Sequence, residues 1–411
     1  MSRIDDLIAD LCPDGVSYRP LGDIAELVRG NGMPKSVLTE TGVGAIHYGQ
    51  IYTKYRTWTE RTISFVSPET ASRLATAKNG DIIITNTSEN LEDVGKAVAW
   101  LGKSPIVTGG HATIIRHSLD PKYLSYWLQT PSFSVQKRAL ASGTKVIDVS
   151  AKQLAKIRVP VPPLEVQQEI VRILDTFSDL EAELEAELEA RRRQYLHYRT
   201  GVFEELTRGD TEQVLLKDLG TWYGGGTPSK RKAEYWSSGT IPWISPKDMA
   251  SSVIETTQDY ITETAVVESS TKKVPAHAVA LVVRSSILNH SLPVSYVPQD
   301  STLNQDMKAV VAREGIIPRY LFHVLRGHRS SLLRSARRAG GSVASLDSNK
   351  LWNFSVPVPS MNEQRRICGL FDRFDALVND LSSGLPAEIE ARRKQYECYR
   401  DKLLTFEEAT S

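Results

Sequence analysis

The sequence predicts an α+β protein built twice: two tandem α+β domains separated by two long helices, which pair as an antiparallel coiled coil with pseudo-two-fold symmetry. Three observations predict this fold. A proline-punctuated segment at 159–170, VPVPPLEVQQEI, returns 197 residues later as VPVPSMNEQRRI. Short apolar runs separated by turn residues precede each copy. Each copy then opens a long helical pattern. Its prolines forbid helix in the segment before that pattern, so they mark where the helix begins.

The duplication extends well beyond this segment. Tyr123 aligns with Tyr320 at the same offset, whereas Tyr195 aligns with Tyr396 at an offset of 201. The second helix has therefore gained four residues, about one turn. The chain divides into an N-terminal helix at 1–15, a first domain at 16–157, a central helical region at 158–211, a second domain at 212–354 and a C-terminal helical region at 355–411.

Within each domain, apolar and β-branched runs predict strands and a proline in the first turn predicts one helix. We expect both domains to hold a small, strongly curved sheet. In the first domain the strands are predicted at 63–66, 80–85 and 112–116 and the helix at 121–128; in the second domain the strands are predicted at 278–283 and 307–312 and the helix at 318–325.

The two long helices carry matching apolar seams with alternating steps of three and four residues. We expect these seams to pack against each other. The first seam comprises Ile170, Ile173, Phe177, Leu180 and Leu184, and the second Ile367, Leu370, Phe374, Leu377 and Leu381.

The two helices differ further along. A Leu-Glu-Ala-Glu repeat at 179–191 continues the first helix past a stutter at Leu188, and Gly384-Leu385-Pro386 should kink or restart the second. The tail 397–411 and the segment 1–15 together mirror 196–212, so the two ends of the chain are predicted to lie close together.

Charge is segregated along the chain. The first domain has 17 Lys and Arg against 11 Asp and Glu, whereas the central helical region has 7 against 12. Two basic domains on acidic helices suggest a polyanion bound at two places. No apolar run of 18 residues and no signal-like N-terminus occur, which excludes a membrane span and leaves the cytoplasm as the expected compartment.

Signatures of catalysis and of metal binding are missing. Cys12, Cys368 and Cys398 lack ligand or disulfide spacing, which indicates a reducing compartment and no metal. The chain has no Gly-x-x-x-x-Gly-Lys motif, no Gly-x-Gly-x-x-Gly opening a helix after a strand, and no Asn- or Asp-Pro-Pro-aromatic motif. We therefore expect no catalytic residues and no cofactor bound to this chain.

Taken together, the pattern resembles the specificity subunit of type I restriction-modification enzymes. The resemblance rests on the order domain, helix, domain, helix, on the VPVPPLEVQQEI helix opening, on the turn Gly224-Gly225-Gly226-Thr227-Pro228-Ser229-Lys230, and on the Leu-Glu-Ala-Glu repeat. It covers nearly the whole chain. The first domain departs from it with Arg29-Gly30-Asn31-Gly32 in place of a Gly-Thr-Pro turn, and the first helix has Val166 where Glu is usual.

The resemblance implies a non-catalytic subunit whose two target-recognition domains each bind one half of a split sequence in double-stranded DNA. It implies that the helices set the spacer and dock two methyltransferase subunits, with restriction-translocase subunits completing the complex. S-adenosylmethionine, ATP and Mg²⁺ are then expected on those partners. Each Leu-Glu-Ala-Glu unit adds roughly 6 Å of helix, so its copy number should change the spacer.

Reading DNA requires polar and aromatic groups on loops, with separate Lys, Arg and backbone N–H contacts to phosphate. The candidates in the first domain are Lys35, Tyr48, Gln50, Lys54, Tyr55, Arg56, Asn86, Thr87, Ser88, His111, Gly143, Thr144 and Lys145. Those in the second domain are Thr227, Ser229, Lys230, Arg231, Lys232, Trp243, Ser245, Lys247, Arg284, Ser285, Ser286, Asn304, Gln305, Asp306, Gly341 and Ser342.

Structural roles compete with several of these assignments. Tyr48 and Trp243 would equally well cap a core, and Asn86 and Asn304 could serve only to satisfy turn backbone. An alternative for the whole chain is a coiled-coil adaptor whose basic domains bind DNA without sequence preference. A specific reader keeps its preference at raised salt, whereas a nonspecific binder loses affinity steeply.

Overall fold

The computed structural model describes residues 3–338, 343–379 and 384–409, and the chain divides into two compact units. The first unit comprises Met1–Leu184 together with Ile389–Ser411, and the second comprises Glu185–Glu388. Each unit therefore combines one domain with part of the long helix α8 (Leu164–Arg208) and part of the C-terminal helical region.

The first unit is a mixed α+β structure. Besides the start of α8 it contains the helices α1 (Arg3–Leu11), α2 (Leu21–Ile24), α3 (Tyr48–Ile51), α4 (Pro68–Ala71), α5 (Pro121–Trp127), α6 (Pro131–Leu140), α7 (Ala151–Leu154) and most of α13 (Leu385–Leu403). Its strands are β1 (Tyr18–Pro20), β2 (Ala25–Arg29), β3 (Val43–Ile46), β4 (Trp58–Thr59), β5 (Ser64–Val66), β6 (Ala75–Ala77), β7 (Ile82–Thr85), β8 (Thr87–Ser88), β9 (Ala97–Trp100), β10 (Ile106–Thr108), β11 (Ala112–His117), β12 (Ile147–Asp148) and β13 (Arg158–Pro160).

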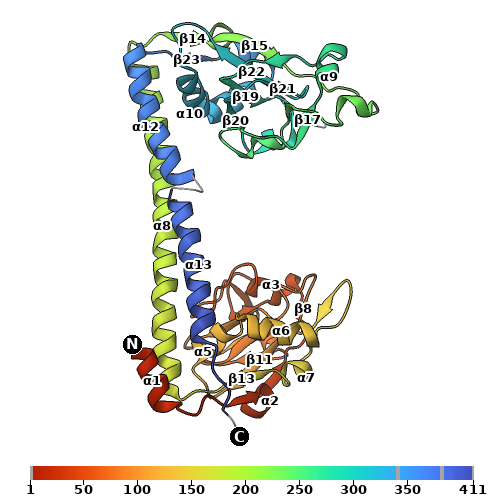
Figure 1. Ribbon diagram of the computed structural model, residues 1–411, viewed down its shortest axis with the longest axis vertical. Helices are drawn as coiled ribbons and strands as arrows, with labels where there is room; N and C mark the ends of the chain where they lie inside the picture. Colours follow the sequence, from red (N-terminus) through yellow and green to blue (C-terminus); the bar gives the residue numbers. More distant parts are fainter. Residues whose placement is uncertain (1–2, 339–342, 380–383, 410–411) are drawn as a thin grey trace. The chain divides into compact units, whose positions relative to one another are not determined.

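These strands form two main sheets, ordered β2-β11-β7-β9-β4 and β5-β3-β10-β6. Helix α5 packs on β9 and buries Tyr123, Leu124, Tyr126 and Trp127 (Figure 1). The prediction of one small sheet was wrong, because the domain holds two main sheets. The second sheet depends on the parallel pairing of β3 with β10, about sixty residues away in the sequence. Nothing in the local pattern of either strand indicates that long-range pairing.

The second unit repeats this plan. Its helices, besides the end of α8, are α9 (Glu263–Glu268), α10 (Pro318–Ala336), α11 (Ser348–Trp352) and α12 (Met361–Asn379). Its strands are β14 (Gln213–Leu215), β15 (Gly220–Gly224), β16 (Ile241–Ile244), β17 (Asp259–Ile261), β18 (Lys273–Val274), β19 (Ala278–Val282), β20 (Val294–Val297), β21 (Ser301–Leu303), β22 (Met307–Ala312) and β23 (Ser355–Pro357). The sheets are ordered β15-β22-β19-β20 and β17-β16-β21-β18, and β16 pairs in parallel with β21 as β3 does with β10.

The repeated proline segment joins each domain to its helix in the same way. The hydroxyl of Tyr123 donates a hydrogen bond to the carbonyl of Pro160 at 3.1 Å, and that of Tyr320 donates to Pro357 at 2.7 Å. The repeated glutamine, Gln167 or Gln364, donates from its amide to the carbonyl of Pro162 or Pro359, 2.8 or 2.9 Å away. The repeated motif is therefore a junction at which side chains satisfy the backbone carbonyls of the proline segment.

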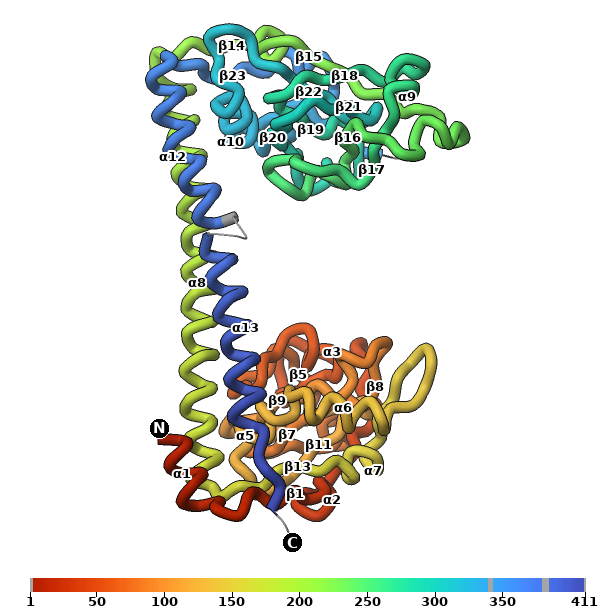
Figure 2. The backbone as a smooth tube through the Cα atoms, in the orientation of Figure 1, coloured from red at the N-terminus to blue at the C-terminus, as the bar shows by residue number. Residues whose placement is uncertain are grey.

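Within each unit the long helices pack antiparallel, as predicted, but with different partners. In the first unit α13 runs alongside α8 (Figure 2). There Phe177 of α8 stacks on Tyr399 of α13 at 5.2 Å, and Arg393 of α13 pairs with Glu181 of α8 at 2.8 Å. In the second unit Tyr195 of α8 stacks on Phe374 of α12 at 5.6 Å. The two predicted seams therefore do not face each other. Each seam lies near the start of its helical region, and antiparallel pairing sets it against the later part of the other region. Leu381 lies outside the described residues.

Other predictions about the helices and the chain ends are confirmed. The C-terminal helical region restarts, with α12 ending at Asn379 and α13 beginning at Leu385. The N–H of Val16 donates to the carbonyl of Glu407 at 2.8 Å, and the N–H of Ala409 donates back to Val16 at 3.1 Å. Segments from the two ends of the chain thus lie side by side.

Candidate nucleic-acid interface

Three predicted residues of the first domain meet at one edge of its sheets. Thr87 on β8 forms a 2.8 Å hydrogen bond with Nδ1 of His111, which directly precedes β11. The ring of Tyr48, at the start of α3, lies 4.9 Å from the His111 ring. Burial lowers the pKa of the neighbouring His47, and the charge of Lys35 lowers it further. Sequence-distant candidates are thus brought together.

A turn containing Gly143, Thr144 and Lys145 lies beside this cluster. Strand β12 pairs with β8, placing Asp148 opposite Thr87, and Ser142 and Asp148 exchange backbone hydrogen bonds of 2.9 and 2.8 Å. Gly143 has a φ of +102°, and a Cβ at this position would lie 2.0 Å from the carbonyl oxygen of Val146. The turn therefore requires glycine, and it leaves Thr144 and Lys145 exposed.

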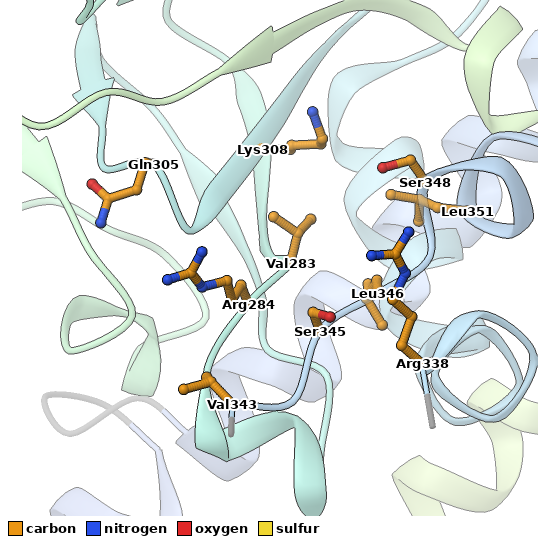
Figure 3. Close-up of a pocket in the computed structure, with 10 residues that line it drawn as sticks. All are labelled: Val283, Arg284, Gln305, Lys308, Arg338, Val343, Ser345, Leu346, Ser348 and Leu351. Atoms are coloured by element: carbon orange, nitrogen blue, oxygen red, sulfur yellow. The ribbon is translucent and has the colours of Figure 1, made fainter. Parts of the chain in front are cut away.

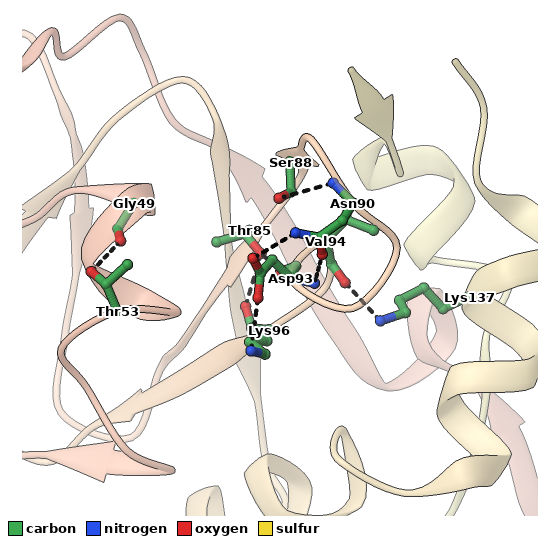
Figure 4. A network of polar contacts seen from close by, with 9 residues as sticks. All are labelled: Gly49, Thr53, Thr85, Ser88, Asn90, Asp93, Val94, Lys96 and Lys137. Carbon is green, nitrogen blue, oxygen red and sulfur yellow. Dashed lines mark hydrogen bonds and ion pairs between the residues drawn. The ribbon is translucent and has the colours of Figure 1, made fainter. Parts of the chain in front are cut away.

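A polar network braces the loop that follows Thr87 (Figure 4). Asp93 bonds to Lys96 at 2.8 Å and to Asn90 at 2.9 Å, and its carbonyl accepts from Thr85 at 3.0 Å. The buried ammonium of Lys137 on α6 donates to the carbonyl of Val94 at 2.7 Å, and burial lowers the pKa of Lys137 to about 8. The loop is thus tied to both β7 and α6.

Four candidates of the first domain are structural. Asn86 is 1% exposed and donates to the carbonyl of Val149 at 2.7 Å, while its side-chain oxygen accepts from Thr113 at 2.8 Å. Gln50 caps α3 through the N–H of His47, the hydroxyl of Tyr55 accepts from the N–H of Ile63, and Ser88 is buried. Asn86 and Ser88 are therefore out of reach of a ligand, whereas Gln50 and Tyr55 are half-buried and serve these local contacts. Lys54 and Arg56 are exposed on the neighbouring turn.

In the second domain the corresponding edge holds a cleft of about 560 Å³. Figure 3 shows Arg284 and Arg338 on opposite sides of it, with Val283 between them. Gln305 and Lys308 also line the cleft. Nε of Arg284 lies 3.4 Å from Oδ1 of Asp306, so three predicted residues converge here. Lys308 and Arg338 were missed, although Arg338 lies only two residues before the predicted Gly-Ser turn that begins at Gly340.

The contact between Arg284 and Asp306 occupies the same place as the one between Thr87 and His111. Thr85 on β7 faces Ala112 on β11, and Val282 on β19 faces Met307 on β22. In both domains one member of the interacting pair lies two residues after the end of the first strand, and the other lies one residue before the second strand. The geometry is repeated, whereas the chemistry at the edge has diverged.

The turn after β15 reaches this cleft. Thr227 and Gln305 share a side-chain hydrogen bond, and Ser229, Lys230 and Arg231 follow on an exposed turn. Lys232 instead donates to the hydroxyl of Tyr235 at 2.7 Å and pairs with Glu268 at 3.3 Å, and both contacts raise its pKa.

The remaining candidates of the second domain divide by burial. Trp243 is 4% exposed and its indole N–H donates to the carbonyl of Gly226, so it caps a core rather than facing a ligand. Ser245 and Asn304 are also buried and hydrogen-bond within their own turns. The exposed members are Lys247 and Ser286, with Ser285 capping the short turn that carries Ser286. Gly341 and Ser342 lie outside the described residues.

Neither a metal site nor a membrane-spanning helix occurs in the described part of the chain. Within residues 3–338, 343–379 and 384–409, no group of three or more His, Cys, Asp or Glu side chains could hold a metal ion. In the same part of the chain, no helix is long and apolar enough to cross a membrane.

Comparison with known proteins gave a consistent result. The family model described as Type I restriction modification DNA specificity domain matches residues 13–190 and 209–391. The chain is 49% identical over 292 residues to the Type I restriction enzyme EcoR124I/EcoR124II specificity subunit of Escherichia coli, covering 69% of this chain and 70% of that protein.

Two solved structures share the fold. A chain from the structural work on complex assembly and conformational transition of the type I R-M system superposes with a TM-score of 0.67 at 16% identity, over 95% of this chain and 97% of that one. The HsdS subunit from Thermoanaerobacter tengcongensis gives a TM-score of 0.51 at 16% identity, over 96% and 97% of the two chains.

Proposed function

This chain belongs to the type I restriction-modification DNA specificity family, whose members are non-catalytic, and we propose that its two domains each read one half of a split target in duplex DNA. One observation carries the proposal. The hydrogen bond between Thr87 and His111 and the ion pair between Arg284 and Asp306 lie at the same position on the strand edge of each domain. A repeated position with different side chains is what two readers of different half-sites require.

The groups around these pairs suit a duplex. Lys308 and Arg338 line the cleft beside the second pair, and Lys145 lies on the turn beside the first. Lys35 is a further exposed cation of the first domain. Phosphate contacts fix the position of a protein on DNA, and contacts to base edges supply the sequence preference. The proposed domain boundaries are 16–157 and 212–354.

We also propose that two methyltransferase subunits dock on equivalent surfaces of the helices. Tyr198 and Tyr399 occupy matching positions and are 48% and 43% exposed, and Leu164 and Met361 match in the same way at 50% and 39%. Apolar side chains exposed twice at equivalent positions fit one partner bound twice. Restriction-translocase subunits would complete the assembly in the cytoplasm, with S-adenosylmethionine, ATP and Mg²⁺ bound by the partners.

The proposal is tested by mapping methylated bases in cells that express this chain together with its methyltransferase partner. A split motif with a fixed gap, absent when the methyltransferase is expressed alone, is the expected result. An intact purified complex that methylates DNA without sequence preference would overturn the proposal and favour an adaptor.

A further inference from the structure

The guanidinium of Arg284 is held from one side only. Its Nε lies 3.4 Å from Oδ1 of Asp306, and the side chain is 62% exposed at the mouth of the cleft. Within the described residues, no hydrogen bond is made by its two terminal nitrogens. The N–H groups on these two nitrogens form a planar fork that no described residue uses, and Figure 3 shows Arg284 beside the cleft.

Asp306 is itself fixed in place. Its backbone N–H donates to the side-chain oxygen of the buried Asn304 at 2.9 Å, and its carbonyl accepts from the N–H of Val283 at 2.8 Å. Its Oδ1 is shielded from solvent, has no hydrogen bond among the described residues, and faces Nε of Arg284. A rigid carboxylate of this kind orients the arginine before any ligand binds.

We propose that Arg284, positioned by Asp306, recognises a guanine in the half-site of the second domain. The inference rests on the proposed function and names the base that this edge reads. An arginine fork matches the O6 and N7 acceptors of guanine in the major groove, which no other base offers as a pair. The cleft behind the fork leaves room for the base edge to approach.

A base fits this place better than a phosphate does. The carboxylate of Asp306 beside the fork repels a phosphate group but tolerates a neutral base. The neighbouring Gln305 donates from its amide to Oδ2 of Asp306 at 3.5 Å, which gives the carboxylate a second contact beside the fork. The equivalent pair in the first domain, Thr87 and His111, has no such fork. Guanine recognition by this route is therefore confined to the second half-site.

The test uses the complex of the full chain with its methyltransferase partner and duplexes carrying the mapped target. Each guanine of the second half-site is replaced in turn by 7-deazaguanine, which lacks only the N7 acceptor. Binding is measured for the wild type, for Arg284→Ala and for Asp306→Asn. The control is Arg334→Ala, which removes one exposed arginine from α10, where among the described residues its side chain bonds only to Ser331.

One guanine is expected to be sensitive in the wild type, with affinity falling roughly tenfold on replacement. Arg284→Ala should lose affinity by a similar factor on the unmodified target and lose no more with 7-deazaguanine. Asp306→Asn should make binding less sensitive to the same replacement than it is in the wild type. Arg334→Ala should behave as the wild type. A half-site without any G·C pair, or an Arg284→Ala complex weakened equally on all sequences, would overturn the assignment. A wild-type complex without sequence preference would instead overturn the proposed function.

Discussion

At the scale of single residues, burial separates the residues that shape the candidate interface from those that can contact a ligand. Asn86 and Thr87 are neighbours in the sequence, yet Asn86 is 1% exposed and bonded on both ends of its amide, whereas Thr87 faces the edge with His111. Sequence reasoning grouped them, because a polar turn after a buried strand shows no sign of which side chain points inward.

Asn86→Ala should therefore cost stability. It removes two hydrogen bonds and leaves the carbonyl of Val149 and the hydroxyl of Thr113 unsatisfied, so we expect a loss of about 1–3 kcal/mol in unfolding free energy, measured by urea denaturation. Thr87→Ala is the matched control and should leave stability nearly unchanged. A stable Asn86→Ala protein with an altered recognition motif would mean that Asn86 contacts DNA directly.

At the scale of elements, the two copies of the domain–helix junction differ at one titratable position. In the first unit the hydroxyl of Tyr126 donates to Asp175 at 2.7 Å. In the second unit the aligned residue is His323, which is fully buried with Nε2 2.9 Å from Asp372. Burial lowers the pKa of His323 from 6.5, although Asp372 acts in the opposite direction. The folded state therefore favours the neutral ring.

This difference predicts a pH dependence. The unfolded chain binds a proton at His323 as the pH falls through 6.5 and the folded chain resists it, so stability is lost below that pH. His323→Tyr, which copies the first unit, should reduce the loss between about pH 7 and pH 5 by up to about 1–2 kcal/mol, measured by denaturant unfolding. His290→Tyr, at an exposed position, is the control. An unchanged pH profile in His323→Tyr would contradict this account.

Element prediction from sequence succeeded where the signal was local. The first-turn prolines of α5 and α10 and the restart of the helix at Leu385 were all predicted correctly. The parallel pairing of β3 with β10, the facing partners of the helix seams, and the inclusion of Lys308 and Arg338 in the cleft depend on long-range contacts. A single sequence shows the candidates for such contacts but not how they pair.

At the scale of the whole molecule, the Leu-Glu-Ala-Glu repeat within α8 is proposed to set the spacer. Inserting one more unit should lengthen the helix by about 6 Å and widen the gap between half-sites by about two base pairs, since the duplex rises about 3.4 Å per pair. Both half-sites should stay unchanged in the mapped methylation motif. Glu183→Gln, which alters the repeat without changing its length, is the control. An unchanged gap after the insertion would show that α8 does not determine it.

The two domains are proposed to read DNA independently, each through the same strand edge. The most direct test maps the methylation motif for His111→Ala and Arg284→Ala, each co-expressed with the methyltransferase partner. His111→Ala should relax one half of the motif and Arg284→Ala the other, with the gap and the opposite half preserved in each case. If either variant altered both halves together, or if both altered the same half, the assignment of one half-site to each domain would be contradicted.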